Sequence, residues 1–423
     1  MVGGSATSGR SLTAAQVSEA VERVAASFVE QEPKPAPIRR TKSGLSQSLT
    51  NVEEEWFSET REHSFQVDGV EVSVVEYCPR VFHFIRQVEA VDDNFFAEEW
   101  RLQKNKVEMN LGEGRSQALF LKSKNFEFMC KTIAEGEADV LCKVLKTYTS
   151  HIVDHPNSLL SRFYLLIKVQ VAKDFGYLLC FGDVFGNASY LNEKWDIKGR
   201  IPKPGKYLSY PHLIRHAYEP DPHLIETPRE RQRRANDAPA QEDEIEVAPE
   251  DKMTIWTRKD KDLTRLFWVE NPTRDKLVNQ ILLDYGWLET AGLMDYSLLI
   301  GVAYKEGKQS RKGKHYIIKN MRVDPLEDGE EAPAERRPSA QHPRPSGFEP
   351  LSEFADGISS LNDQEVYYIG IIDMLTEYGA AKKFANFFKG FLWTDETLST
   401  IPPPAYKKRI ATFTELIFPS IVP

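Results

Sequence analysis

The spacing of apolar residues predicts an antiparallel sheet with helices in the first half of the chain. Val-Asp-Gly-Val at 67–70 is typical of a tight hairpin turn, and the valines after it alternate with polar residues. Later stretches repeat apolar residues at helical or strand spacing. The expected elements are a helix over 81–88, two strands within 117–133, a helix over 136–153, and strands over 163–171 and 176–184.

The second half of the chain reads as a mixture of helix and strand. A helix is expected over 277–288, where apolar residues recur at helical spacing, and Gly292 is placed to end it. Strands are expected over 296–304 and 315–320, with a third that ends at Ile372. An antiparallel sheet with helices, followed by a mixed region, indicates an α+β fold of two lobes.

Three segments lack this periodicity, and we expect them to be unfolded. They are rich in proline, charge and small polar residues, so they cannot bury enough apolar surface to offset the entropy of ordering. They are an N-terminal tail over 1–51 and two inserts over about 219–252 and 324–357. The inserts interrupt a second lobe placed at 186–423, and the first lobe is placed at 52–185.

Composition and charge exclude several classes of protein. No run of about 18 apolar residues occurs, and residues 1–9 lack the charged start and apolar core of a signal peptide. The four cysteines are scattered among apolar neighbours, as in a reduced cytosolic protein. A net charge of −9 argues against a general nucleic-acid binder. We therefore expect a cytoplasmic enzyme without a transmembrane segment.

Two aspartates stand at the ends of apolar runs. Asp295 lies between the predicted helix and the apolar run after it, and Asp373 ends the run 366–372. An acid at the carboxyl end of a buried strand can reach a bound divalent metal ion. The alternatives are that Asp295 only caps or turns the chain, and that Asp373 caps a helix over 374–378.

Two lysines and a glycine pair are candidates for contacts to phosphate. Lys131 follows apolar residues in a predicted strand, where it either meets a partner or reaches solvent at the strand end. Lys198 lies in a predicted loop, and most loop lysines are simply exposed. Gly112 and Gly114 precede the first strand pair, where glycines let backbone N–H groups approach phosphate, although such pairs usually form plain turns.

Six short motifs are spread over most of 67–413. The longest is Met-Asp-Tyr-Ser-Leu-Leu at 294–299. The others are Tyr-Cys-Pro-Arg-Val-Phe at 77–82, Cys-Lys-Thr-Ile at 130–133, Ser-Leu-Leu-Ser-Arg-Phe-Tyr at 158–164, Asp-Ile-Lys-Gly at 196–199 and Ile-Ile-Asp at 371–373. Their sequence and order resemble the phosphatidylinositol phosphate kinase family. The resemblance implies that family's two-lobed α+β fold, distantly similar to protein kinases, with ATP and Mg²⁺ as its cofactors.

The resemblance implies nucleotide-binding roles for five residues. Lys131 would contact the ATP phosphates, with Glu137 as its acidic helix partner. Gly114 and Ser116 would belong to the Gly-rich loop over the phosphates, and Asp183 would lie in the connection between the lobes that meets adenine. The second glycine of the family's loop is missing here, which puts the nucleotide affinity or the rate in doubt.

The resemblance also assigns the chemistry. Asp373 would bind magnesium, and Asp295 would orient the attacking inositol hydroxyl or help to bind the metal. Lys198 would lie at the active site near the phosphates. Arg200 stands where the family has a serine, which is a further departure.

An amphipathic segment follows Asp373. Its phenylalanines recur at helical spacing, with lysines outside that apolar face, so it fits either a core helix or a helix at an anionic membrane. The resemblance favours the membrane, because the family's activation loop, here 374–404, inserts into the bilayer and selects the lipid. The residues expected at the membrane are Lys382, Lys383, Ala385, Phe387, Phe388, Lys389 and Phe391.

Together these observations predict a lipid kinase at the cytosolic face of a membrane. Its acceptor would be a phosphatidylinositol monophosphate in an anionic membrane, and its product phosphatidylinositol 4,5-bisphosphate. Ala385 slightly favours the 5-phosphate as acceptor, since the family's type II enzymes have alanine there and its type I enzymes glutamate. The alternatives are a 4-phosphate 5-kinase, a weak or inactive kinase acting as a phosphoinositide-binding scaffold, and a kinase for soluble inositol phosphates. The resemblance also allows a homodimer through the first lobe.

Overall fold

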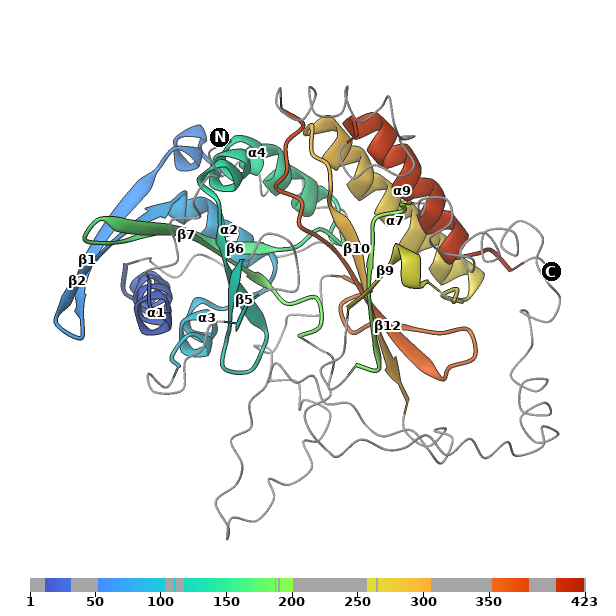
Figure 1. The fold of residues 1–423 in the computed structure, drawn as a ribbon, viewed down its shortest axis with the longest axis horizontal. Helices are drawn as coiled ribbons and strands as arrows, with labels where there is room; N and C mark the ends of the chain where they lie inside the picture. Colours follow the sequence, from blue (N-terminus) through green and yellow to red (C-terminus); the bar gives the residue numbers. More distant parts are fainter. Residues whose placement is uncertain are drawn as a thin grey trace, which may run out of the picture.

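The protein is described by a computed structural model. It describes residues 12–31, 52–102, 110–111, 118–186, 188, 191–200, 257–263, 265–305, 352–379 and 401–421. Two sheets, each with its own helices, make up two lobes that lie side by side (Figure 1). The expected α+β class is therefore confirmed.

The first lobe is built on a seven-stranded antiparallel sheet in the order β1-β2-β6-β7-β5-β4-β3. Its strands are β1 (Thr60–Val67), β2 (Val70–Tyr77), β3 (Asn110–Leu111), β4 (Leu119–Lys122), β5 (Phe128–Ile133), β6 (Phe163–Val171) and β7 (Asp174–Gly182). Its helices are α1 (Ala14–Gln31), α2 (Pro79–Val88), α3 (Asp93–Glu99), α4 (Glu135–Asp154) and the short η3 (Glu54–Phe57).

The hairpin between β1 and β2 forms at the predicted turn. Val67 pairs with Val70, and the two turn residues Asp68 and Gly69 have φ angles of 51° and 78°. Positive φ at both positions gives the turn a twist that matches the flanking strands. The expected strands and helices of 81–184 are also present, with ends shifted by a few residues.

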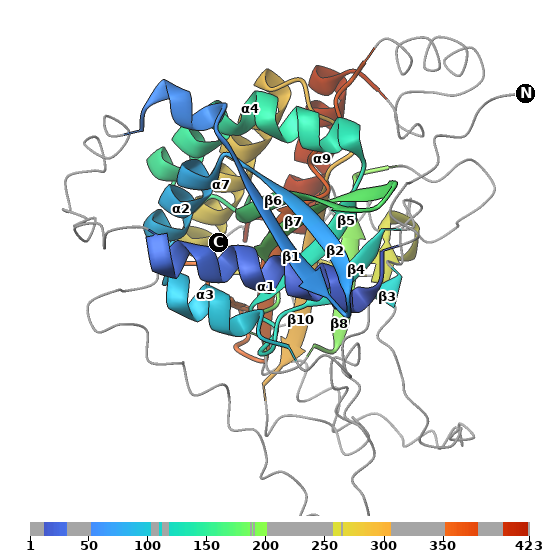
Figure 2. The same cartoon turned by 90° about the vertical axis from the view of Figure 1, so that its left-hand side faces the viewer.

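The prediction of an unfolded tail over 1–51 is wrong for its middle part. Helix α1 buries Val17, Val21, Val24 and Phe28, each at most 2% exposed. The helix contacts α3, β1 and β2, and Figure 2 shows it lying beside α3 across the sheet. Because these side chains recur on one helix face, α1 belongs to the core of the first lobe.

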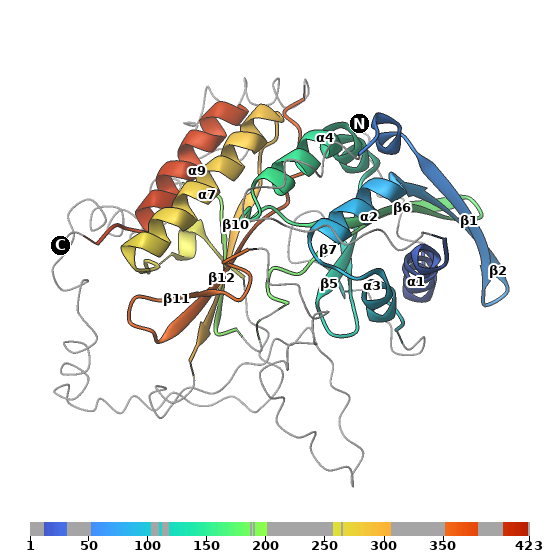
Figure 3. The same cartoon turned by 180° about the vertical axis from the view of Figure 1, so that it is seen from behind.

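The second lobe has a five-stranded sheet in the order β11-β12-β10-β8-β9, in which only the β8–β9 pair is parallel. The strands are β8 (Glu193–Ile197), β9 (Thr257–Lys259), β10 (Ser297–Tyr304), β11 (Ile358–Ser359) and β12 (Glu365–Ile372). Helices α7 (Asn271–Thr290) and α9 (Pro403–Ile417) contact each other and run together along this lobe (Figures 1 and 3), and the short η5 (Asp260–Asp262) follows β9.

Helix α7 confirms the expected helix over 277–288, with Leu277, Ile281, Tyr285 and Leu288 fully buried. The strand expected over 315–320 and the insert over 219–252 lie outside the described residues. The C-terminal boundary predicted for the second insert, 324–357, lies too far along the chain. Residues 352–357 form turns, and Phe354 is buried in the core.

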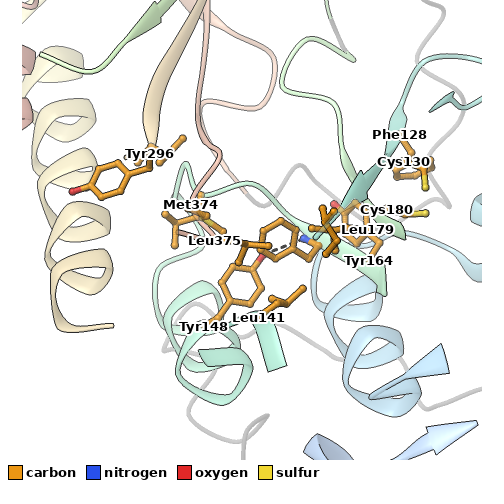
Figure 4. Close-up of a cluster of buried hydrophobic side chains, with 14 of the residues drawn as sticks. Phe128, Cys130, Leu141, Tyr148, Tyr164, Leu179, Cys180, Tyr296, Met374 and Leu375 are labelled. Carbon is orange, nitrogen blue, oxygen red and sulfur yellow. Dashed lines mark hydrogen bonds between the residues drawn. The ribbon is translucent and has the colours of Figure 1, made fainter. Parts of the chain in front are cut away.

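The two lobes share one core. Figure 4 shows Leu141 and Tyr148 of α4 in the same cluster of buried side chains as Met374 and Leu375 of the second lobe. The Tyr148 hydroxyl donates to the Ser161 carbonyl at 2.7 Å, just before β6 begins. This shared packing fixes the lobes against each other. No helix among the described residues is both long and apolar enough to cross a membrane.

Candidate active site

Three predicted site residues lie at one edge of the five-stranded sheet. Lys198 follows β8, Asp295 lies two residues before the start of β10, and Asp373 follows β12. β10 runs antiparallel to both neighbours, and its start pairs with the ends of β8 and β12. The start of one strand and the ends of two others therefore meet at the same edge, which brings these side chains together.

Both aspartates have a left-handed backbone. The φ angles are 61° at Asp295 and 56° at Asp373. Aspartate is among the few non-glycine residues that visit this region, at a cost of roughly 1–2 kcal/mol. The alternative that Asp373 caps a helix over 374–378 is wrong. That stretch is not helical, and it runs beside the segment before Asp295, where the Met294 N–H donates to the Thr376 carbonyl at 2.9 Å.

Lys131 reaches across from the first lobe to Asp373. Its Nζ lies 2.9 Å from Asp373 Oδ1, and only 14% of the lysine side chain is exposed, so it does not simply point to solvent. Burial acts against both charges, but their attraction is stronger. The pKa of Asp373 is held below its ordinary value despite burial, chiefly by Lys131 with help from Lys198.

Glu137 differs from its predicted role. Its Oε2 accepts from the Ala134 N–H at 2.9 Å and so caps the start of α4, whereas the carboxylate that contacts Lys131 is Asp373. Burial acts to lower the pKa of Lys131, but Asp373 and then Glu137 raise it above its ordinary value. Glu137 therefore acts on the lysine through its charge.

Lys198 holds Asp295 in place. Its Nζ lies 3.1 Å from Asp295 Oδ1 and also donates to the Asp295 carbonyl. The lysine side chain is 14% exposed and that of Asp295 is 37% exposed. The ammonium group thus fixes both the backbone and the side chain of an aspartate that remains open to solvent.

Sequence reasoning missed Asp260, which supports this edge from η5. One of its oxygens, Oδ1, accepts from the N–H groups of Lys198 and Gly199 at 2.9 and 2.8 Å. Burial raises the pKa of Asp260 to about 6. The residue stands in the charged run 258–262, which looks like a solvated surface, so no pattern in the sequence distinguishes it.

The predicted glycine-rich loop joins two paired strands next to Lys131. β3 and β4 form a hairpin, and Phe120 of β4 pairs with Lys131 of β5. Gly114 and Ser116 lie outside the described residues, within the connection of this hairpin. The membrane residues predicted within 382–391 also lie outside the described part of the chain.

The connection between the lobes is held tightly against the second sheet. Asp183 Oδ1 accepts from the Phe185 N–H at 3.0 Å, and its Oδ2 lies 3.5 Å from Lys122 Nζ. A Cβ added at Gly301 would lie 2.6 Å from the ring of Phe185. Glycine is therefore needed on β10 for this connection to pack.

The two aspartates suit a magnesium ion better than a metal whose coordination shell is made entirely of protein side chains. Among the described residues no group of three or more His, Cys, Asp or Glu side chains could hold a metal. Mg²⁺ commonly takes one or two carboxylates and completes its shell with water and phosphate oxygens. Asp295 and Asp373, both partly exposed, supply such carboxylates, and the buried Asp295 Oδ1 has no partner beyond its ion pair with Lys198.

Comparison with known proteins identifies the family. Residues 102–417 match the family model described as Phosphatidylinositol-4-phosphate 5-Kinase. Phosphatidylinositol 4-phosphate 5-kinase 1 of Arabidopsis thaliana is 26% identical over 81% of this chain and 44% of its own length, so the chain spans less than half of that relative. Phosphatidylinositol 5-phosphate 4-kinase type-2 gamma of Xenopus tropicalis is 26% identical over 81% of the chain and 75% of its own length. This chain belongs to the phosphatidylinositol phosphate kinase family.

Proposed function

We propose that this protein transfers the γ-phosphoryl group of ATP to a phosphatidylinositol monophosphate. The observation that carries the proposal is the meeting of Lys131 and Asp373 from opposite lobes beside the Lys198–Asp295 pair. Phosphoryl transfer depends on positioning and on charge stabilisation. Two lysines and two carboxylates at one sheet edge can supply both.

Each residue would act on a different part of the reactants. Lys131 and Lys198 would bind phosphate oxygens, where negative charge spreads in the transition state. Asp295 would accept a hydrogen bond from the attacking inositol hydroxyl and share the metal with Asp373. Bound Mg²⁺ would neutralise charge between the phosphate oxygens.

The proposal of a lipid acceptor rests on the sequence of residues 382–391, which follow β12. A phenylalanine face flanked by Lys382, Lys383 and Lys389 suits the surface of an anionic membrane. Ala385 slightly favours phosphatidylinositol 5-phosphate as the acceptor. The named relatives are a 4-phosphate 5-kinase and a 5-phosphate 4-kinase.

One assay tests the chemistry and the isomer together. The protein is given labelled ATP, Mg²⁺ and vesicles containing either monophosphate isomer, with soluble headgroups in a parallel reaction. We expect labelled lipid, formed faster from the 5-phosphate. Asp373→Asn and Lys131→Met should each lower the rate roughly 100-fold or more, because both groups stabilise charge in the transition state. Exposed Asp174→Asn is the control.

The outcomes separate the candidate functions. Vesicle binding without transfer by the wild-type protein would favour a scaffold, for which the missing glycine of the Gly-rich loop is the motivating observation. Transfer to soluble headgroups alone would favour an inositol phosphate kinase. Wild-type rates in both folded site variants would contradict the roles proposed for Lys131 and Asp373.

A further inference from the structure

A further aspartate, outside the group of charged residues at the sheet edge, is fully buried between the lobes. Asp284 lies on α7 with no exposed side-chain surface. Its Oδ1 lies 2.7 Å from Nε2 of His151 on α4 and accepts from the Gln280 amide at 3.0 Å. Its Oδ2 accepts from the Leu159 N–H at 2.7 Å. A buried carboxylate is tolerated only with such partners, so this one ties α7 to α4 and to the segment 158–161.

That segment is bonded directly to the strand that ends in Asp373. The Leu159 carbonyl accepts from the Ile371 N–H at 2.7 Å. The N–H and hydroxyl of Ser161 donate to the Ile371 carbonyl at 3.0 and 2.9 Å. Leu160 and Ile371 form a parallel bridge. Residues 159–161 thus act as a short extra strand on β12.

The extra strand covers a part of β12 that β11 does not reach. β11 pairs only with Val366 and Tyr367, whereas β10 pairs with the whole other side of β12. Near Ile371, two residues before Asp373, the outer edge is therefore held by 159–161. Any shift of this segment would be passed to the backbone that aims the Asp373 side chain.

We propose that Asp284 is a positioning residue for phosphoryl transfer. It fixes Leu159, Leu159 fixes the end of β12, and the end of β12 fixes Asp373 against Lys131. This inference rests on the function proposed above, and it gives the contact between the lobes a role in catalysis. Loss of a group that orients a metal ligand typically costs about 10- to 100-fold in activity or metal affinity.

The test compares Asp284→Asn with Asp275→Asn on the same helix, where the side chain is 59% exposed. The amide introduced by Asp284→Asn has a single acceptor oxygen, so it loses either the bond from the Leu159 N–H or the bond from the Gln280 amide. We expect kcat to fall roughly 10- to 100-fold and the Mg²⁺ concentration for half-activation to rise, with KM for lipid vesicles unchanged. Hydrogen exchange should become faster in 158–163 and 365–373 but not in α1.

Each outcome decides the proposal. A folded Asp284→Asn protein with either kcat or exchange of 365–373 at the level of the control overturns it, even if the melting temperature falls. If Asp284→Asn does not fold, Ser161→Ala carries the test, because it removes only the hydroxyl contact to Ile371 and should produce the same changes at smaller size. If the wild type transfers no phosphate, the proposed function fails, and the exchange comparison alone decides whether Asp284 fixes β12.

Discussion

At the scale of single residues, the site depends on three aspartates in two different environments. Asp295 and Asp373 are partly exposed and adopt positive φ angles beside a lysine. Asp260 is buried, accepts hydrogen bonds from two backbone N–H groups, and lies 4.0 Å from Nε of Arg200. The first two can meet a ligand, whereas the third shapes the loop that carries Lys198.

Asp260 predicts a specific pH dependence of stability. Its pKa in the fold is about 6, above the value of an unfolded aspartate, so its contribution is fully present below about pH 4 and is lost as pH rises through 6. A pKa difference of about two between the folded and unfolded states corresponds to about 3 kcal/mol of unfolding free energy. Asp260→Asn keeps the acceptor for Lys198 and Gly199 and removes the charge. Denaturation from pH 4 to 7.5 should show the wild type losing stability relative to this variant.

The matched control for Asp260 is the exposed Asp174, changed to Asn. The difference in unfolding free energy between Asp174→Asn and the wild type should vary much less across the same pH range. A constant difference between the wild type and Asp260→Asn would mean that burial of this carboxylate does not disfavour its charged form.

At the scale of elements, the sequence predicted most strands and helices but missed α1. The hairpin at Asp68 and Gly69 was predictable because local φ preferences decide it. The start of α1 also carries a local signal, since Thr13 and Gln16 exchange side-chain-to-backbone bonds as a capping box. Apolar residues at helical spacing follow it. Glycine- and proline-rich stretches flank the helix on both sides, so the average composition of residues 1–51 hides its periodicity.

The site was predictable in its residues but not in its contacts. Lys131, Lys198, Asp295 and Asp373 meet as expected, because each lies within or close to the end of a strand with a clear apolar pattern. The contact of Lys131 with Asp373 joins residues 242 positions apart. Such a pair depends on how the lobes pack, which no local spacing encodes. Glu137, the partner chosen from local spacing, acts on Lys131 through its charge, whereas Asp373 makes the direct contact.

Packing of β10 against the connection between the lobes predicts a contrast between two glycines. A Cβ at Gly301 would lie 2.6 Å from Phe185 and 2.9 Å from Leu191, whereas a Cβ at Gly286 of α7 meets only Lys407 Nζ at 3.8 Å. Overpacking should make Gly301→Ala less stable by about 1–3 kcal/mol. Gly286→Ala should gain about 0.4–1 kcal/mol, because alanine loses less entropy in a helix. Thermal unfolding measures both.

The same two glycine variants also test where the nucleotide binds. If the connection containing Asp183 meets adenine, Gly301→Ala should weaken ATP binding, and Gly286→Ala should leave it unchanged. Equal melting temperatures for the two variants would show that Phe185 can move aside without cost.

At the scale of the whole molecule, a net charge of −9 opposes approach to an anionic membrane. A lipid kinase of this charge needs a local basic and apolar surface that outweighs the general repulsion. The segment 382–393 is the part of the sequence with that character. Membrane binding should therefore depend on this segment far more than on the charge of the rest of the protein.

Changing Phe387 and Phe388 together to Ser should separate a membrane role from a core role. If these rings face lipid, vesicle binding and lipid phosphorylation fall sharply while the melting temperature barely changes. Burial of a large side chain in a core contributes about 1.5–3 kcal/mol, so two core phenylalanines would cost several kcal/mol. A large drop in melting temperature, with normal vesicle binding by the folded fraction, would assign these rings to the core.

Charge reversal tests the electrostatic half of the same surface. Lys382 and Lys383 changed together to Glu should weaken binding to anionic vesicles, and added salt should shrink the wild-type advantage, because exposed charges are screened over about 10 Å at 0.1 M salt. Exposed Lys124 and Lys173, changed together to Glu, alter the net charge equally at another place. If both double variants lose binding to the same extent, net charge rather than a defined basic surface governs membrane approach. Loss of binding confined to the Lys382 and Lys383 variant would show that a defined basic surface in the segment after β12 governs binding to the membrane.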